Sequence, residues 1–410
     1  MTKKLNNKII FIVLVVALLG GGFYAGTKFE KSRSNSEIDE IVTEISNKGT
    51  GQPASIDFGL FWTALSKLEE KFVDQEKLQD KRNLVYGAIE GMVNSLGDPY
   101  TAFLKPEESK KFEEQINGSF GGVGIEIGMR KNLLTVIAPI KDTPAYKAGI
   151  LAGDIITKIN DKDAGNLTID EAVTQIRGKR GTSVKLTIQR NGDKDPKEFN
   201  LTREEIKIPT IDWKLLDGNV AHIQLFTFNR NIDADFNKTA REILASQAEK
   251  IILDLRNNPG GILDSAVNIA SWFLGPNETV VSERFADRTE TVLKTNNNGQ
   301  LKKYPLIIII NKGSASASEI LAGALRDNRG VKIVGETSFG KGSVQELVEF
   351  LSGNKKSTLK ITIAKWFTPG GISISDNGIK PDFEVKKDEE ETEKDPLKDP
   401  QLEKALEVLK

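Results

Sequence analysis

The sequence contains no cysteine and only one histidine, His222. The absence of cysteine excludes disulfide bonds, thiolate metal sites and a cysteine nucleophile. A zinc site would need mostly carboxylate ligands, and a Ser-His-Asp triad would depend on that single imidazole. We therefore expect no metal and no cofactor. A serine nucleophile would need another base, and the known alternative is a neutral lysine.

The chain also lacks an excess of charge of either sign. It has 57 Lys and Arg against 58 Asp and Glu, a net charge of −1 over 410 residues. No overall field attracts nucleic acid, so nucleic acid is not an expected partner. The length is enough for two or three domains with their own cores.

A single long apolar run stands near the N-terminus, where residues 9–26 carry no charge and follow Lys3, Lys4 and Lys8. Eighteen residues just reach the length that spans a bilayer, and the lysines place that end in the cytoplasm. No clear small-x-small cleavage site follows, which favours an uncleaved signal anchor. We predict a single transmembrane helix in residues 1–28, with the rest of the chain outside the cytoplasm.

The remaining segments differ in their periodicity. Helical spacing predicts an N-terminal helical region, short strands with glycine turns follow it, and strands then alternate with helices as in an α/β core. An acidic tail precedes a last short helix. The predicted boundaries are a linker at 29–55, the helical region at 56–115, the short-stranded domain at 116–205, the core at 206–385, and the acidic linker with its helix at 386–410.

Two loops of the core carry the candidate chemistry. Residues 311–320 read NKGSASASEI after a buried strand, and residues 335–345 read GETSFGKGSVQ. We take Ser316 as the candidate nucleophile, with Ser314 and Ser318 as rivals and Ser318 the better helix cap. Ser316 and Glu319 also fit a plain capping box, which is the alternative interpretation. Both can hold, because a helix N-terminus offers unpaired N–H groups that bind an oxyanion.

Lys341 is the candidate base in the second loop. A base must be neutral, whereas a free lysine has a pKa of about 10.4. Apolar burial lowers a lysine pKa, and we expect Phe339 and the surrounding strands to supply it. Gln345 could orient the ammonium group.

Two other motifs share this lysine. Residues 335–341 resemble a phosphate-binding P-loop, but Gly342 stands where the Mg²⁺ ligand should be Ser or Thr. Ser338 and Lys341 also form S-x-x-K, as in penicillin-recognising acyl transferases. That motif needs one helical turn, and the glycines at 340 and 342 argue against a helix.

The serine and lysine loops resemble those of the C-terminal processing peptidases, or tail-specific proteases. The resemblance extends over residues 56 to 385. It rests on ordered motifs: YGAIEGM at 86–92, SLGDPYTAF at 95–103, LDLRNNPGG at 253–261, FTPG at 367–370 and GIKPD at 378–382.

The resemblance implies a crotonase-like α/β protease core, with Ser316 as nucleophile, Lys341 as general base and Gln345 as support for the lysine. It also implies an oxyanion hole from the N–H groups of Ala317 and of Gly260 or Gly261, and the sequence leaves the choice of glycine open. We expect Asp254 and Arg256 to be structural. The catalytic part would lie at a bacterial cell surface or in a periplasm.

The middle strands resemble a PDZ domain inserted before the core. Residues 120–127 read FGGVGIEI and would form its carboxylate-binding loop, while the helix at 169–176 forms the other wall of the groove. The predicted peptide-binding residues are Gly121, Gly122, Val123, Gly124 and Ile125. Arg177 is placed where a regulatory contact with the protease would be expected.

The sequence thus predicts a serine endopeptidase that acts on exported proteins with free C-termini, and a PDZ domain that selects them or gates the site. The alternatives are a catalytically idle PDZ adaptor, an S-x-x-K acyl transferase and, last, a P-loop nucleotide hydrolase. The terminal helices could mediate a homodimer, as in some members of the family.

Overall fold

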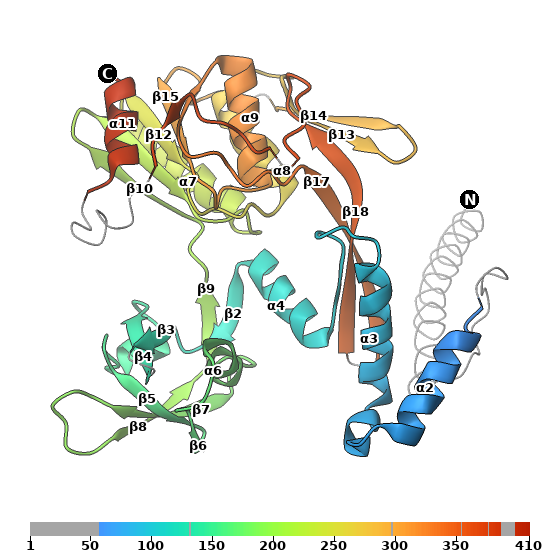
Figure 1. Ribbon diagram of the computed structural model, residues 1–410. Coiled ribbons are helices and arrows are strands. Elements are labelled where there is room, and N and C mark those ends of the chain that lie inside the picture. The colour runs from blue at the N-terminus through green and yellow to red at the C-terminus, as the bar shows by residue number, and fades with distance from the viewer. Residues whose placement is uncertain (1–56, 131–132, 297, 354, 376, 387–397) are drawn as a thin grey trace, which may run out of the picture. The chain divides into compact units, whose positions relative to one another are not determined.

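The computed structural model describes residues 57–130, 133–296, 298–353, 355–375, 377–386 and 398–410 (Figure 1). The chain forms two units, Met1–Lys110 with Gln345–Ile363, and Lys111–Val344 with Ala364–Lys410. The predicted membrane segment at 1–28 and the linker at 29–55 lie outside the described residues. Within the described part of the chain, every helix is too short or too polar to cross a bilayer.

A mainly parallel sheet forms the centre of the second unit, as the alternation of strands and helices predicted. The strand order is β10-β11-β12-β15-β16-β19, with all neighbours parallel except the β10–β11 pair. These strands are β10 (Ile211–Leu216), β11 (Val220–Leu225), β12 (Lys250–Asp254), β15 (Leu306–Ile310), β16 (Lys332–Gly335) and β19 (Phe383–Glu384).

Helices cover both faces of this sheet (Figure 1). Ile251 and Leu253 of β12 belong to the main core, whereas Ile252 between them belongs to a second core that includes Ala405. Burial on both faces explains why β15 is a continuous apolar run rather than an alternating one. The covering helices are α7 (Ile232–Ala245), α8 (Leu263–Phe273) and α9 (Ala317–Arg329) on the main core, and α11 (Pro400–Val408) on the second.

A smaller antiparallel domain precedes this sheet within the same unit. Its strands follow the order β3-β4-β5-β7-β8, so β3 lies at one edge. Its core is built from short apolar strands and from α6, with Asp154 buried and paired to Arg190. The elements are β3 (Ile125–Arg130), β4 (Leu133–Pro139), α5 (Pro144–Lys147), β5 (Ile155–Ile159), β6 (Lys162–Asp163), α6 (Ile169–Ile176), β7 (Ser183–Gln189) and β8 (Lys197–Thr202).

A two-stranded sheet brackets this smaller domain. Strand β2 (Ser119–Gly122) pairs with β9 (Glu204–Lys207) just before and after it. The helix α4 (Pro106–Asn117) leads into β2. Elsewhere in the chain, β13 (Thr279–Phe285) and β14 (Glu290–Lys294) form an antiparallel hairpin. The strands therefore close a domain that is inserted between the N-terminal helices and the α/β core.

The first unit combines the N-terminal helices with a later part of the chain. Strand β17 pairs with β18, and β1 pairs with β18 in the register Ala102↔Lys360. The helical prediction for this region is confirmed, but the grouping with residues 345–363, which we had assigned to the core, was not anticipated. The elements are α2 (Gly59–Lys71), η2 (Gln75–Leu78), α3 (Lys81–Asn94), β1 (Ala102–Leu104), β17 (Ser343–Ser352) and β18 (Lys355–Phe367).

Candidate active site

Ser316 lies at the junction between the loop after β15 and the start of α9. It is the N-cap residue of the helix and is partly exposed. Its backbone has φ 55° and ψ −118°. A non-glycine residue rarely adopts this conformation, which persists only where the surroundings impose it and which is most frequent at functional sites.

The two rival serines of this loop are fully buried and already engaged. The hydroxyl of Ser314 donates to the carbonyl of Leu255 at 2.8 Å, and that of Ser318 donates to the carbonyl of Asn258 at 3.0 Å. The expectation that Ser318 caps the helix is therefore wrong, because Ser316 holds that position. Of the three serines, only Ser316 is partly exposed.

Glu319 connects this serine to the lysine loop. Its Oε2 accepts a hydrogen bond from the backbone N–H of Ser316 at 2.7 Å, the reach-back contact of a capping box. The same oxygen accepts from the backbone N–H of Lys341 at 3.0 Å. The main chains of the two candidate catalytic residues thus converge on one atom.

The other carboxylate oxygen of Glu319 serves the lysine loop alone. Oε1 accepts from the hydroxyl of Ser338 at 2.6 Å and from the N–H of Gly340 at 2.7 Å. The side chain is 1% exposed. Burial raises the pKa of Glu319 above its ordinary value, and the four hydrogen bonds act in the opposite direction.

The lysine loop is held from several sides. The N–H of Phe339 donates to the carbonyl of Ser314 at 3.0 Å, and the indole of the buried Trp366 donates to the carbonyl of Lys341 at 2.9 Å. Lys341 itself is partly buried. Phe339 is 56% exposed, and its part in burying the lysine stays a prediction.

The course of this loop argues against both rival motifs. Residues 336–342 contain no helix, and β17 follows Lys341 where a P-loop would begin a helix. An S-x-x-K pair needs the two side chains one helical turn apart, and this loop is not helical. The hydroxyl of Ser338 also accepts from the N–H of Ile379 at 2.6 Å in addition to its bond to Glu319.

The glycine turn after β12 lies directly against Ser316. A Cβ atom at Gly260 would come within 2.8 Å of both the Cβ of Ser316 and the N of Ala317. The N–H of Gly260 already donates to Oδ1 of Asn258 at 2.9 Å. Among the described residues no hydrogen-bond acceptor is found for the N–H of Gly261 or of Ala317. The geometry therefore favours Gly261 over Gly260 as the oxyanion donor.

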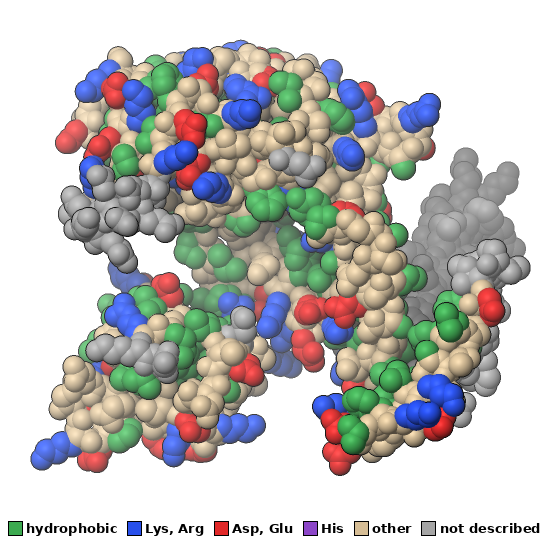
Figure 2. Space-filling view, viewed as in Figure 1, with side chains coloured by type: hydrophobic (Ala, Val, Ile, Leu, Met, Phe, Trp, Pro, Cys, Tyr) green, Lys and Arg blue, Asp and Glu red, His purple; other side chains and the backbone are tan. Residues whose placement is uncertain are grey.

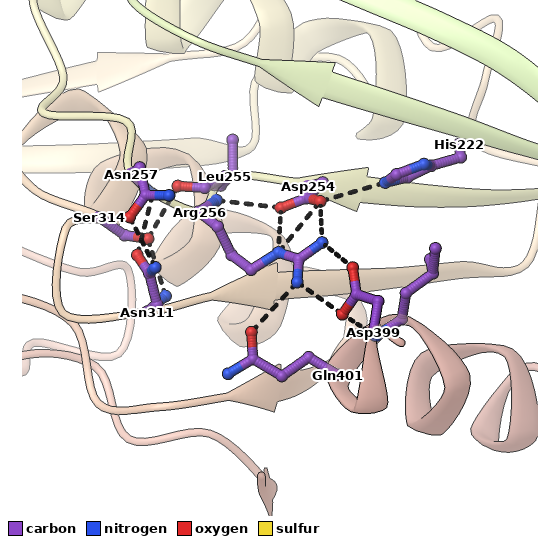
Figure 3. Close-up of polar contacts among 10 residues, drawn as sticks. His222, Asp254, Leu255, Arg256, Asn257, Asn311, Ser314, Asp399 and Gln401 are labelled. Carbon is purple, nitrogen blue, oxygen red and sulfur yellow. Dashed lines mark hydrogen bonds and ion pairs between the residues drawn. The ribbon is translucent and has the colours of Figure 1, made fainter. Parts of the chain in front are cut away.

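The polar cluster at the end of β12 is structural, as expected (Figure 3). Arg256 bridges Asp254 and Asp399, the N-cap residue of α11, at 2.6 and 2.8 Å. Burial would raise the pKa of Asp254, but hydrogen bonds from His222 and Arg256 outweigh it and lower that pKa. The only imidazole of the chain, His222, is buried against Asp254 with its Nε2 3.1 Å from Oδ2. It is committed to this cluster.

Gln345 lies on β17 in the first unit, where its amide nitrogen is 3.5 Å from Oγ1 of Thr362. Its role toward Lys341 stays a prediction.

Four of the five predicted peptide-binding residues line a groove of the smaller domain, and Gly121 does not. Gly122, Val123, Gly124 and Ile125 form one wall together with Phe120, and α6 contributes the other through Val173 and Ile176. The edge strand β3 begins at Ile125 beside this groove. Gly121 approaches the carbonyl of Gly178 so closely that a Cβ would lie 2.0 Å from it.

Arg177 lines the same groove. Its guanidinium lies over the ring of Phe120, 3.7 Å from the centroid, and 3.6 Å from the carboxylate of Glu114. In this conformation its contacts are with the groove and α4. On the face shown in Figure 2, Lys and Arg are interspersed with Asp and Glu, in keeping with the balanced composition.

Three functional features went beyond the sequence reasoning. They are the bonds that Glu319 accepts from Ser338, Gly340 and Lys341, the bond that Gly260 donates to Asn258, and the bond that the hydroxyl of Ser338 accepts from Ile379. The capping-box pattern at 316–319 was the only signal that could have pointed to the first of them.

Comparisons with known proteins agree with this arrangement. The model of peptidase family S41 matches residues 219–385, a PDZ domain model matches residues 135–190, and the model of the N-terminal domain of the activating protease CtpB matches residues 14–108. The smaller domain is therefore a PDZ domain, and the loop at 120–127 that was predicted to bind a carboxylate precedes the matched residues.

Two curated relatives match most of the chain. A carboxy-terminal-processing protease of Bartonella bacilliformis is 39% identical over 75% of this chain and 71% of its own length. The carboxy-terminal processing protease CtpB of Bacillus subtilis is 34% identical over 93% of this chain and 78% of its own. A crystal structure of a putative S41 protease from Bacteroides fragilis shares the fold, with TM-score 0.51 and 16% identity over 78% of this chain and 89% of that one.

Proposed function

The chain belongs to peptidase family S41, among the carboxy-terminal processing proteases, and from this premise we propose that Ser316 is its nucleophile and Lys341 its general base. The protein is a serine-type endopeptidase that processes the C-termini of proteins, and it carries a PDZ domain. One observation supports the assignment most strongly: a single oxygen of Glu319 holds the main chains of both residues.

The proposed reaction begins with neutral Lys341, which accepts the proton of the Ser316 hydroxyl as its oxygen attacks the scissile carbonyl. The oxyanion that forms is bound by the N–H groups of Ala317 and Gly261, at the positive end of the α9 dipole. The lysine then returns the proton to the leaving amine. Water hydrolyses the acyl-enzyme with Lys341 again as base. Gln345 supports the lysine, a role that rests on the family resemblance.

The PDZ groove is proposed to bind the free C-terminus of the substrate. A bound chain would add to the edge of β3, and its carboxylate would reach the N–H groups of the loop 121–125. Arg177 lies at this groove against Phe120 and Glu114. We therefore propose that peptide binding is sensed by Arg177 and gates the protease.

Two further parts of the proposal concern location and assembly. The apolar residues 9–26 would anchor the protein, with its catalytic part outside the cytoplasm at the cell surface or in the periplasm. Helix α2 has no buried residue and exposes Leu60 at 82%, so a second copy of the chain could cover it. Membrane fractionation and light scattering of the purified protein test these two parts.

The base assignment is tested by the pH dependence of cleavage. We expect kcat/KM to rise with pH as the ammonium of Lys341 loses its proton. Lys341→Arg should be inactive even at alkaline pH, because an arginine does not deprotonate there. His222→Gln should keep the wild-type profile. Activity in a folded Lys341→Arg protein, or a profile lost in a folded His222→Gln protein, would show that the base is assigned wrongly.

A further inference from the structure

Glu319 makes more contacts than a helix cap requires. A capping box needs one reach-back bond to the N-cap residue, and the bond to Ser316 supplies it. The other three bonds go to Ser338, Gly340 and Lys341, on a loop 19 to 22 residues further along the chain. This buried carboxylate therefore links the two loops at the residues that carry Ser316 and Lys341, in addition to the bond from the N–H of Phe339 to the carbonyl of Ser314.

The chemistry of the donors requires a carboxylate at this position. Three of the four partners are backbone N–H groups, which can only donate. An ionised carboxylate accepts from all four, with about four lone-pair sites on its two oxygens. An amide of the same shape would place an NH₂ group against backbone donors on one side. The side chain is buried, so water cannot replace a lost partner.

The backbone of Ser316 adds a second requirement. With φ at 55° it lies in a sparsely populated region of backbone conformation and must be held there by its surroundings. The bond from its N–H to Glu319 is one such constraint. The glycine turn at Gly260, packed against the Cβ of Ser316, is another.

We propose that Glu319 is a positioning residue that holds the nucleophile and the base in register with each other. The inference rests on the proposed roles of Ser316 and Lys341. Glu319 does not touch the substrate; it acts by fixing the main chain at both residues. Because proximity effects depend steeply on geometry, a loop shifted by about 1 Å costs about a hundredfold in rate.

Ser338 extends the same device. Its hydroxyl donates to Glu319 and accepts from the N–H of Ile379, and its own N–H donates to the carbonyl of Ile379 at 3.1 Å. It thereby fastens the lysine loop to the GIKPD segment at 378–382. Ser338, which resembled a rival nucleophile in the sequence, is therefore assigned the role of supporting the lysine loop.

The experiment compares Glu319→Gln, Glu319→Asp and Ser338→Ala with a matched control, Glu171→Gln. Glu171 reaches back to the N-cap of α6 in the same way, but it is exposed, and within the described part of the chain its hydrogen bonds are with Thr168. Steady-state cleavage of an unstructured protein gives kcat and KM, the rate of labelling by a fluorophosphonate reports the reactivity of the serine, and circular dichroism checks folding.

We expect Glu319→Gln to lower kcat and the labelling rate together by about a hundredfold, with KM changed by less than about twofold. Glu319→Asp keeps the charge and should recover part of this loss. Ser338→Ala should lose about tenfold or less, and Glu171→Gln should match the wild type. If Glu319→Gln does not fold, Glu319→Asp and Ser338→Ala provide the test instead, because each should lower kcat and leave KM nearly unchanged.

The result that overturns the inference is a folded Glu319→Gln enzyme with wild-type kcat and labelling rate while Ser316→Ala is inactive. Loss of kcat with an unchanged labelling rate contradicts it as well. An active Ser316→Ala enzyme, in contrast, would refute the proposed function itself. The two failures are therefore distinguishable.

Discussion

Two helices of this protein begin with the same motif and use it differently. Helix α6 of the PDZ domain starts with a capping box of Thr168 and Glu171, and α9 of the protease core starts with Ser316 and Glu319. In both, a glutamate accepts from the N–H of the N-cap residue, at 2.8 and 2.7 Å. The reach-back bond is therefore the same at the two helix starts.

Their surroundings are opposite. Thr168 has an ordinary extended backbone, with φ −68° and ψ 161°, and Glu171 is exposed. Hydrogen bonds from Thr168 lower the pKa of Glu171, whereas burial raises that of Glu319. One box only starts a helix, and the other also fixes a strained serine beside a second loop. The comparison teaches that a motif becomes an active site through what is packed against it.

The largest difference is expected when each N-cap hydroxyl is removed. Ser316→Ala should abolish cleavage, a loss of about 10⁴-fold or more, because the nucleophile is gone. Thr168→Ala should lower stability by about 1 kcal/mol through the lost cap and leave kcat unchanged. Cleavage assays and urea unfolding measure the two effects. Activity of Ser316→Ala comparable to that of the wild type would contradict the assignment of Ser316 as the nucleophile.

A smaller difference is expected from one glycine beside each helix start: Gly260, which packs against Ser316, and Gly165, in the turn before α6. Gly260→Ala would bring a Cβ within 2.6 Å of the carbonyl of Ala315, at a backbone φ of 90°, and should lower kcat by about a hundredfold. Gly165→Ala meets only the side chain of Asp163, at 3.3 Å, and should be tolerated. Equal kinetics for the two alanine variants, both folded, would contradict the close packing of the turn on Ser316.

The smallest expected effect is on the pH dependence of the free energy of unfolding, to which the two glutamates contribute with opposite signs. The pKa of Glu319 is raised in the folded state. At pH values between its unfolded and folded pKa, the native protein therefore keeps a proton that the unfolded chain has released. The contribution of Glu319 to the free energy of unfolding falls as pH rises through this range. The lowered pKa of Glu171 acts in the opposite way, and its contribution is lost as pH falls.

Glu319→Gln should therefore remove a contribution to the free energy of unfolding that decreases with increasing pH. Glu171→Gln should remove one that increases with increasing pH. Urea unfolding at a series of acidic to neutral pH values measures both slopes against the wild type. Slopes of the same sign for the two variants would contradict the assigned environments.

Local patterns predicted much of the fold. The buried run at 306–310 predicted β15, and the pattern at 318–326 predicted the helix α9, which extends three residues further at its C-terminal end. The loops that carry Ser316 and Lys341 were identified because the chain has so few other residues for nucleophilic chemistry. Strand and helix periods depend on neighbours in sequence, which is why they could be read there.

What could not be predicted depends on contacts between distant segments. The sequence left Gly260 and Gly261 equivalent, and only the bond from Gly260 to Asn258 separates them. Phe339 was expected to be buried with the lysine, but more than half of this residue is exposed. Glu319 was recognised as a cap, whereas its three bonds to the lysine loop require the tertiary fold.

The most direct test of the central claim is to identify the labelled residue. The full-length protein is treated with a fluorophosphonate, digested and mapped by mass spectrometry, with Lys341→Arg treated in parallel. A single adduct on Ser316 in the wild type and none in Lys341→Arg is the predicted result. An adduct on Ser314, Ser318 or Ser338, or equal labelling of Ser316 in Lys341→Arg, would contradict it.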